Sequence, residues 1–194
     1  GYDGVVQVLM PGGGLGSGSL LYTGRHILTA AHVVDDGTGN PWPSIDVVFE
    51  LSDSTRFSMT SSVMYIHPGW TGDLFDGNDI AIIVLPETAP IEADRYDIYR
   101  GSSELNREFT IVGYGTAGQG AEQFLDGQKR FGANKFEAYG EALNGHSYLD
   151  FVNGLLGPGT FNIPSGNVLL YDFDSGLAAN DALGMALGIR DTGL

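Results

Sequence analysis

The sequence predicts an all-β fold, and three observations carry that prediction. Short apolar runs recur along the chain at the spacing of hairpins, separated by turn residues. The 194 residues include 30 glycines and 8 prolines, which suits many short strands and tight turns better than long helices. Hydrophobic residues make up 42% of the chain, which is enough to build a core and argues against disorder.

In the first half of the chain, β-rich runs alternate with clear turn signals. A Pro-Gly-Gly-Gly turn at 11–14 ends the first run, and Thr23-Gly24 joins the next two. A single helical turn over Ala30–Val33 follows and carries His32. The strands expected here are Val5–Met10, Leu20–Tyr22, His26–Thr29, Ile45–Glu50, Arg56–Thr60, Val63–Ile66 and Ile80–Leu85.

The second half of the chain has weaker patterns. Pro86 and Pro90 end the preceding strand, and the polar stretch Ile91–Asn106 is interpreted as a passage between two halves. A glycine-rich loop at 113–120 follows a strand, but it lacks the Lys-Ser/Thr pair and the helix of a phosphate-binding loop. The elements expected here are strands at Glu108–Tyr114, Lys129–Ala138 and Val168–Phe173, and a short helix within Leu177–Ile189.

Charge and cysteine content exclude several classes of protein. The net charge is -15, from 24 acidic and 9 basic side chains, so a nucleic-acid partner is not expected. Without cysteine, the chain can build no disulfide framework, zinc-thiolate site or thiol nucleophile. No apolar run approaches the roughly 18 residues of a membrane span, so no membrane partner is expected.

His32 and Asp79 stand out as a candidate catalytic pair. Small residues, Ala30 and Ala31, precede His32 and allow the turn to pack against a core while the imidazole faces a cleft. Asp79 opens the apolar run Ile80–Leu85, so its carboxylate is expected to be largely buried and to need a partner. An imidazole Nδ1–H is a suitable partner, and it leaves Nε2 free to take a proton from a nucleophile.

The other histidines and one acidic loop are given structural interpretations. His26 lies in a strand-like run, His67 precedes a proline, and His146 has no acidic neighbour at a useful spacing. The loop at 35–40 has the oxygen-rich composition of a calcium site, but it lacks the spacing and closing glutamate of an EF-hand. A surface turn is therefore favoured there, with a structural calcium as the alternative, and no other cofactor is expected.

The motifs around the pair resemble a known family. Leu-Thr-Ala-Ala-His at 28–32 and Asn-Asp-Ile-Ala at 78–81 are similar to the trypsin/chymotrypsin-like serine proteases, in their cysteine-free bacterial form. The resemblance implies two six-stranded Greek-key β-barrels, the second of them incomplete in this chain. The resemblance also implies three parts of the chain: a first β-barrel at 1–95 with His32 and Asp79, a connector at 96–105, and part of the second β-barrel at 106–194.

The same resemblance implies a function. It makes the protein a secreted serine endopeptidase that acts on proteins or peptides, with His32 as general base and later acid and Asp79 as its orienting partner. The family's nucleophile motif, Gly-Asp-Ser-Gly-Gly-Pro, is absent from the sequence. The nearest match is Phe-Asp-Ser-Gly-Leu at 173–177, where Phe173 would crowd the turn that supplies an oxyanion-hole N–H.

We therefore expect the nucleophile on a segment beyond Leu194, either removed or present as a separate C-terminal chain, and we expect this chain alone to be inactive. Ser175 as the nucleophile is one alternative. A catalytically inactive, protease-like binding module and a serine esterase on the same scaffold are the others. Three further serines, Ser17, Ser19 and Ser165, stand beside glycines, where turn chemistry accounts for them.

Overall fold

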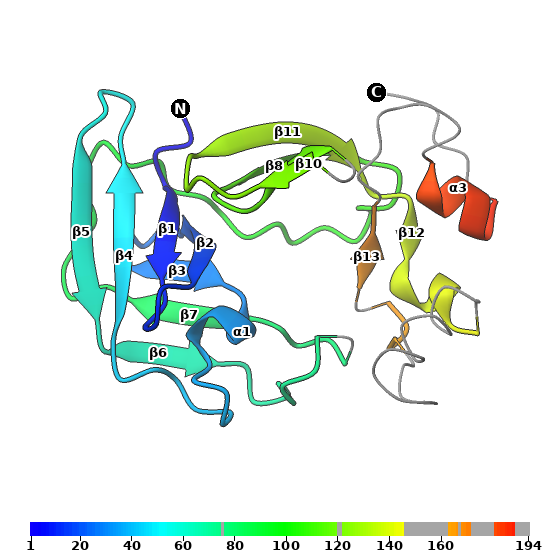
Figure 1. Cartoon of the computed structure of the whole chain (residues 1–194), viewed down its shortest axis with the longest axis horizontal. Helices are drawn as coiled ribbons and strands as arrows, with labels where there is room; N and C mark the ends of the chain where they lie inside the picture. The colour runs from blue at the N-terminus through cyan, green and yellow to red at the C-terminus, as the bar shows by residue number, and fades with distance from the viewer. Residues whose placement is uncertain (75, 120–121, 146–162, 167, 172–180, 189–194) are drawn as a thin grey trace. The chain divides into compact units, whose positions relative to one another are not determined.

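The computed structural model describes residues 1–74, 76–119, 122–145, 163–166, 168–171 and 181–188 (Figure 1). Across these ranges the chain is mostly β-structure with very little helix, so the all-β prediction is confirmed. The chain divides into two compact units. The first comprises Gly1–Gly72, Asn78–Arg100 and Val112–Phe131, and the second comprises Asp73–Gly77, Gly101–Ile111 and Gly132–Leu194. The expected connector at 96–105 and the number of barrels stay predictions.

The first unit is built on one antiparallel sheet of seven strands in the order β5-β4-β1-β2-β3-β7-β6. Three strands, β3, β4 and β6, have the bounds that the sequence predicts. A β9–β10 hairpin, Ala117–Gln119 and Glu122–Phe124, also belongs to this unit. The sheet strands and the helical turn are β1 Val5–Leu9, β2 Leu15–Leu20, β3 His26–Thr29, α1 Ala31–Val34, β4 Ile45–Glu50, β5 Arg56–Ser61, β6 Val63–Ile66 and β7 Ala81–Val84.

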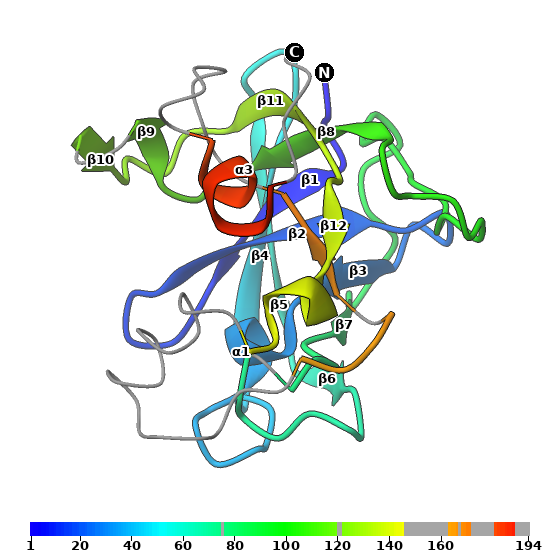
Figure 2. The same cartoon turned by 90° about the vertical axis from the view of Figure 1, so that its right-hand side faces the viewer.

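This sheet is strongly curled because its two edge strands are neighbours in sequence. Only Ser62 separates β5 from β6, so the two edges must come together at that residue. Buried Ser61 fixes the bend, since its Oγ donates to Val84 O at 2.6 Å and accepts from Val63 N at 3.1 Å. Figure 1 shows β4 and β5 running vertically and β6 and β7 running across them, and in the turned view of Figure 2 β4 stays upright while β6 and β7 are foreshortened.

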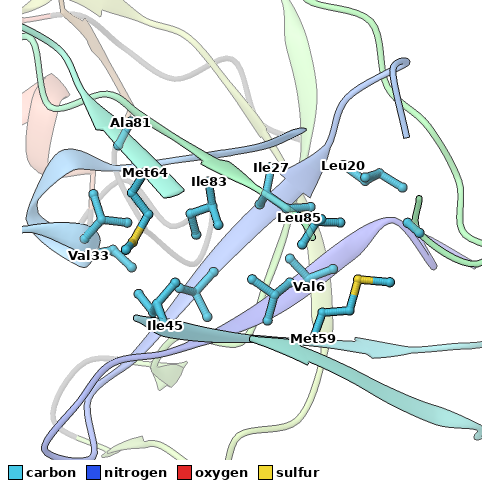
Figure 3. Close-up of a cluster of buried hydrophobic side chains, with 14 of the residues drawn as sticks. Val6, Leu20, Ile27, Val33, Ile45, Met59, Met64, Ala81, Ile83 and Leu85 are labelled. Carbon is cyan, nitrogen blue, oxygen red and sulfur yellow. The ribbon is translucent and has the colours of Figure 1, made fainter. Parts of the chain in front are cut away.

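The inside of the curl holds one hydrophobic cluster to which all seven strands and α1 contribute. On β4, Ile45, Val47 and Phe49 are buried at alternate positions, as expected for a strand with one face on a core. Figure 3 shows Ile83 and Leu85 pointing toward side chains from the facing strands. Full burial of such a side chain contributes about 1.5–3 kcal/mol, so this cluster is the main support of the unit.

The predicted strand Leu20–Tyr22 is wrong in its position, because β2 runs from Leu15 to Leu20 through a glycine-rich segment. The glycines serve close packing here. A Cβ at Gly16 would lie 2.7 Å from Val33 Cγ1, and a Cβ at Gly18 would collide with the side chain of Ile27. Glycine is the residue that lets a strand pass this close to neighbouring elements.

The second unit has shorter elements. Among them, β12 (Ala138–Tyr139) pairs with β13 (Leu169–Leu170), and a 3-10 turn η1 spans Gly140–Leu143. A further two-stranded sheet joins β8 (Glu108–Gly113) to β11 (Arg130–Lys135), and each of these strands has residues assigned to both units. The predicted strand Lys129–Ala138 is thus divided between β11 and β12, and part of the predicted strand Val168–Phe173 lies outside the described residues.

The helix α3 lies within the predicted range Leu177–Ile189 but is shorter, spanning Ala182–Leu187. Asp181 caps its first turn by accepting from Gly184 N, and Gly188 ends it in the left-handed conformation with φ 69°. None of the helices in the described ranges has the length and apolar character needed to cross a bilayer.

Candidate active site

His32 is presented to solvent by a single turn whose other side chains are buried. In α1, Ala31, Val33 and Val34 face the hydrophobic cluster and are at most 4% exposed. Because these three residues anchor the turn, His32 is left on the opposite side with 51% of its side chain exposed. The small Ala31 lets the turn lie close to the core, as the sequence predicts.

Asp79 comes beside His32 through the register of two antiparallel strands. Thr29, the last residue of β3, pairs with Ala81, the first residue of β7. The segment that leaves β3 and the segment that enters β7 therefore meet at the same end of the sheet. Asn78, directly before the acid, has a φ of 60°, so the chain turns sharply just before Asp79.

The carboxylate of Asp79 holds His32 at two points. Its Oδ2 lies 2.8 Å from His32 Nδ1, and its Oδ1 accepts the His32 backbone N–H at 2.9 Å. An ionised carboxylate only accepts hydrogen bonds, so the imidazole proton in this contact belongs to Nδ1 and Nε2 carries the lone pair. Asp79 is less buried than expected, with 24% of its side chain exposed, because its partner is itself at the surface.

Ser17 makes long-range hydrogen bonds that the sequence pattern did not reveal. Ser17 lies within β2, where its carbonyl accepts from Thr29 Oγ1 at 2.8 Å and its Oγ accepts from Tyr114 N at 2.9 Å. Ser17 therefore links β3, the strand before His32, to Tyr114, the residue directly after β8. Its expected role in turn chemistry is wrong, because these partners are 12 and 97 residues away.

A pocket of about 470 Å³ borders the exposed imidazole. Asp35 connects its two sides, since Oδ2 accepts from Trp70 Nε1 at 2.7 Å and Oδ1 accepts from Gly37 N at 2.8 Å. Burial raises the pKa of Asp35, but these hydrogen bonds outweigh it and hold the pKa below its ordinary value. The pocket is lined by His32, Asp35, Gly37, Thr38, Gly39, Trp70, Thr71 and Gly72.

The oxygens of the 35–40 loop are used as acceptors for N–H and O–H donors. Asp35 also accepts from Gly39 N at 2.9 Å, and Asp36 Oδ1 accepts from Thr38 N and Thr38 Oγ1 at 2.9 and 2.6 Å. These contacts are those of turns stabilised by aspartate side chains. Within the described ranges, no group of three or more His, Cys, Asp or Glu side chains could hold a metal ion.

The other two described histidines, His26 and His67, have hydrogen-bond partners other than His32 and Asp79. His26 Nδ1 lies 2.7 Å from Thr23 Oγ1, and His67 Nδ1 accepts from Gly69 N at 3.1 Å. Ser165 donates to Glu141 Oε1 at 2.8 Å in the second unit. His146 and Ser175 lie outside the described residues.

Comparison with known proteins gives a family and a fold. The family model for Trypsin matches residues 3–138, and a search of curated proteins finds no match. Among solved structures, the chain is similar to mouse neuropsin, described as a serine protease expressed in the limbic system of the brain. The TM-score is 0.62 at 15% sequence identity, over 91% of this chain and 72% of that one.

Proposed function

The chain belongs to the trypsin family, whose model matches well over half of its length, and from that premise we propose that it acts as a serine endopeptidase with His32 as its general base. The trypsin-like fold and a peptidase function in general follow from family membership and from the structural likeness. The observation that carries the finer proposal is the two-point contact between Asp79 and His32.

The chemistry follows from the free lone pair on His32 Nε2. Nε2 takes the proton of a serine hydroxyl as its oxygen attacks the scissile carbonyl, and Asp79 stabilises the imidazolium that forms. His32 then gives this proton to the leaving amine when the C–N bond breaks, which leaves an acyl-enzyme. Water then attacks the ester of the acyl-enzyme with His32 again as base, which releases the carboxylic acid product and regenerates the free serine. These steps need only protein groups, so we propose that no cofactor takes part.

We further propose that the nucleophile is a serine outside the 194 residues, because Gly-Asp-Ser-Gly-Gly-Pro is absent from them. That serine would lie on a C-terminal segment of the same polypeptide or on a separate chain made from it, with Ser175 as the alternative position. Substrates are then proteins or peptides, and we propose that the protein acts after secretion. The missing motif also favours one second function, a protease-like binding module without activity.

A phosphonate probe for active-site serines tests this proposal. The native-length protein and the 194-residue chain are each treated with the probe, and labelled peptides are identified by mass spectrometry. We expect labelling of a serine outside these residues in the native-length protein, and neither labelling nor peptide hydrolysis by the 194-residue chain alone. His32→Ala should abolish labelling, whereas His26→Ala should preserve it, because His26 contacts Thr23 instead of Asp79.

Three results would count against parts of the proposal. Labelling that survives His32→Ala would overturn the role of His32. Labelling of Ser175, or measurable turnover by the 194-residue chain, would overturn the placement of the serine outside it. An unlabelled native-length protein, with its full mass verified, would favour the binding module.

A further inference from the structure

Asp79 lies in the neck of the loop that joins β6 to β7. Ile66 ends β6 and pairs with Ala81, the first residue of β7. One step beyond this pair, Ile80 O accepts the N–H of His67 at 2.9 Å. The two ends of the loop therefore stay hydrogen-bonded up to the residue beside Asp79, so the position of its carboxylate depends on both of them.

A second contact across this neck involves the residue on the other side of Asp79. Asn78 Nδ2 donates to Gly69 O at 3.3 Å, and Asn78 adopts the left-handed conformation with a φ of 60°. The approach is close, because a Cβ at Gly69 would lie 3.0 Å from Asn78 Nδ2. Gly69 belongs to the turn at 67–70, which is closed by a hydrogen bond of 2.9 Å from the N–H of its last residue to the carbonyl of its first. Both neighbours of Asp79 in the chain are thus bonded to one turn.

The same turn is also bonded to α1, the element that carries His32. Trp70 ends the turn, and its Nε1 donates to Asp35 Oδ2 at 2.7 Å. Asp35 directly follows α1, and its N–H donates to Ala31 O at 2.9 Å, so it takes part in the last hydrogen bond of the helical turn. The indole of Trp70 also packs against the hydrophobic cluster of the first unit. Its contact with the carboxylate therefore joins α1 to the turn that flanks Asp79.

These contacts close a ring that contains the proposed catalytic pair. Three hydrogen-bonded contacts join its parts, namely His32 to Asp79, Asn78 to Gly69, and Trp70 to Asp35. Each remaining step of the ring is a covalent segment of neighbouring or nearly neighbouring residues. When the contact of the imidazole with its carboxylate opens, the other two contacts keep both groups within reach of one another. Such proximity favours the closed, oriented arrangement that proton transfer requires.

We propose that Trp70 is a positioning residue for the catalytic pair, because its hydrogen bond to Asp35 joins α1 to the turn that fixes Asp79 and so favours the closed contact between Asp79 and His32. In this role Trp70 acts through other residues and not on the reacting atoms. The inference rests on the proposed function for its catalytic meaning. The contact itself needs no nucleophile, so it can be measured in the 194-residue chain.

The proton on His32 Nδ1 provides a direct readout. Its exchange with water, measured by NMR on nitrogen-15-labelled protein, becomes faster when the contact with Asp79 opens more often. Trp70→Phe removes the Nε1 donor but keeps an aromatic ring against the core, and we expect exchange to become about tenfold faster. Trp42→Phe is the matched control, because the buried Trp42 Nε1 has no hydrogen-bond partner among the described residues. There we expect a change of less than about twofold.

Asn78→Gly tests the other end of the connection. Glycine accepts a φ of 60° without strain, so this variant removes the contact with Gly69 and keeps the backbone conformation. Because both contacts act through one turn, Asn78→Gly should accelerate the exchange less in the Trp70→Phe background than in the parent chain. If Trp70→Phe does not fold, as judged by circular dichroism, Asn78→Gly in the parent chain gives the same readout, with an expected acceleration of about threefold.

Kinetic constants of the native-length protein separate positioning from substrate contact. We expect Trp70→Phe to lower kcat about tenfold and to change KM by less than about twofold, because the loss affects proton transfer and not peptide binding. A higher KM with an unchanged kcat would make Trp70 a substrate-contact residue and would overturn the positioning role.

Exchange that Trp70→Phe leaves unchanged would overturn the proposal. Equal acceleration in Trp70→Phe and Trp42→Phe would also overturn it, since it would indicate a general loss of stability. Fully additive effects of Trp70→Phe and Asn78→Gly would overturn the connection through one turn. Failure of the proposed function gives a different pattern. Exchange that depends on Trp70 in a native-length protein without serine labelling leaves the contact assignment intact, whereas labelling with unchanged exchange in Trp70→Phe removes the positioning role alone.

Discussion

The two compact units differ in how their structure is supported. In the first, seven strands and α1 share one hydrophobic cluster, and His32 and Asp79 are held at one end of that sheet. In the described part of the second, the buried pair Leu143 and Ile163 forms a small cluster beneath two-residue strands. The comparison indicates that the packing of a single unit positions the proposed catalytic pair to within a hydrogen bond.

Loss of the contact between Asp79 and His32 should have the largest effect, and that effect should be on peptide hydrolysis. Asp79→Asn keeps the size of the side chain but lets an amide nitrogen face His32, which disfavours the Nδ1–H form. We expect kcat of the serine-containing protease to fall on the order of 10⁴-fold, measured by peptide hydrolysis. Asp53→Asn, at a distant turn, should change kcat by less than about twofold, and an equal loss in both variants would contradict the special role of Asp79.

A matched pair of leucine truncations compares the two cores directly. Leu85 is fully buried in the large cluster, and Leu143 is 9% exposed in the small one. We expect Leu85→Ala to lower the free energy of unfolding by about 4 kcal/mol and Leu143→Ala to lower it by about 2 kcal/mol, from urea titrations. Equal losses would show that the second unit is as well packed as the first.

The loss of folding stability at acid pH should also differ between the two units, by less than the leucine truncations do. Burial raises the pKa of Asp3, but hydrogen bonds from Ser52 and the charge of Lys129 outweigh it and leave the pKa below its ordinary value. A carboxyl with a lowered pKa stabilises the fold above its unfolded pKa, and the stabilisation is lost as pH falls through the folded pKa. For Asp3 we expect a loss of about 1 kcal/mol as the pH falls from about 5 to about 2.

The comparison residue in the second unit is Glu141. The Ser165 hydroxyl and the Gly166 amide lower its pKa in the same direction, but Glu141 is more exposed to solvent than Asp3. Urea midpoints across the same pH range should become flatter in Asp3→Asn and change little in Glu141→Gln. The reverse order would contradict the assignment of the larger acid-sensitive contact to the first unit.

The sequence predicts those features of the fold that have a local signal. The β-rich run Ile45–Glu50 predicts β4 with its observed bounds, and the small alanines beside His32 predict a turn packed on the core. The all-β class and the trypsin-like fold are confirmed on this basis. Gly16 and Gly18 mislead local reasoning, because glycine in a strand and glycine in a turn look alike until the neighbours at Val33 and Ile27 are known.

The features that the sequence does not reveal are hydrogen bonds between distant residues. Ser17 binds Tyr114 across 97 positions, and Asp35 binds Trp70 across 35 positions. Such contacts depend on the register and curl of the sheet, and a lone serine or aspartate leaves no periodic pattern that would indicate them. The burial of Asp79 is overestimated for a similar reason, since an apolar strand following an acid does not fix how much solvent reaches it.

The central claim is that Asp79 holds His32 with its proton on Nδ1 and its lone pair on Nε2. Nitrogen-15 NMR of the imidazole in the 194-residue chain tests it most directly, with His32→Ala for assignment and Asp79→Asn for comparison. In the neutral imidazole, we expect a protonated Nδ1 and a bare Nε2 that become a mixture in Asp79→Asn. A His32 protonated at Nε2, or ring signals that Asp79→Asn leaves unchanged, would contradict the claim.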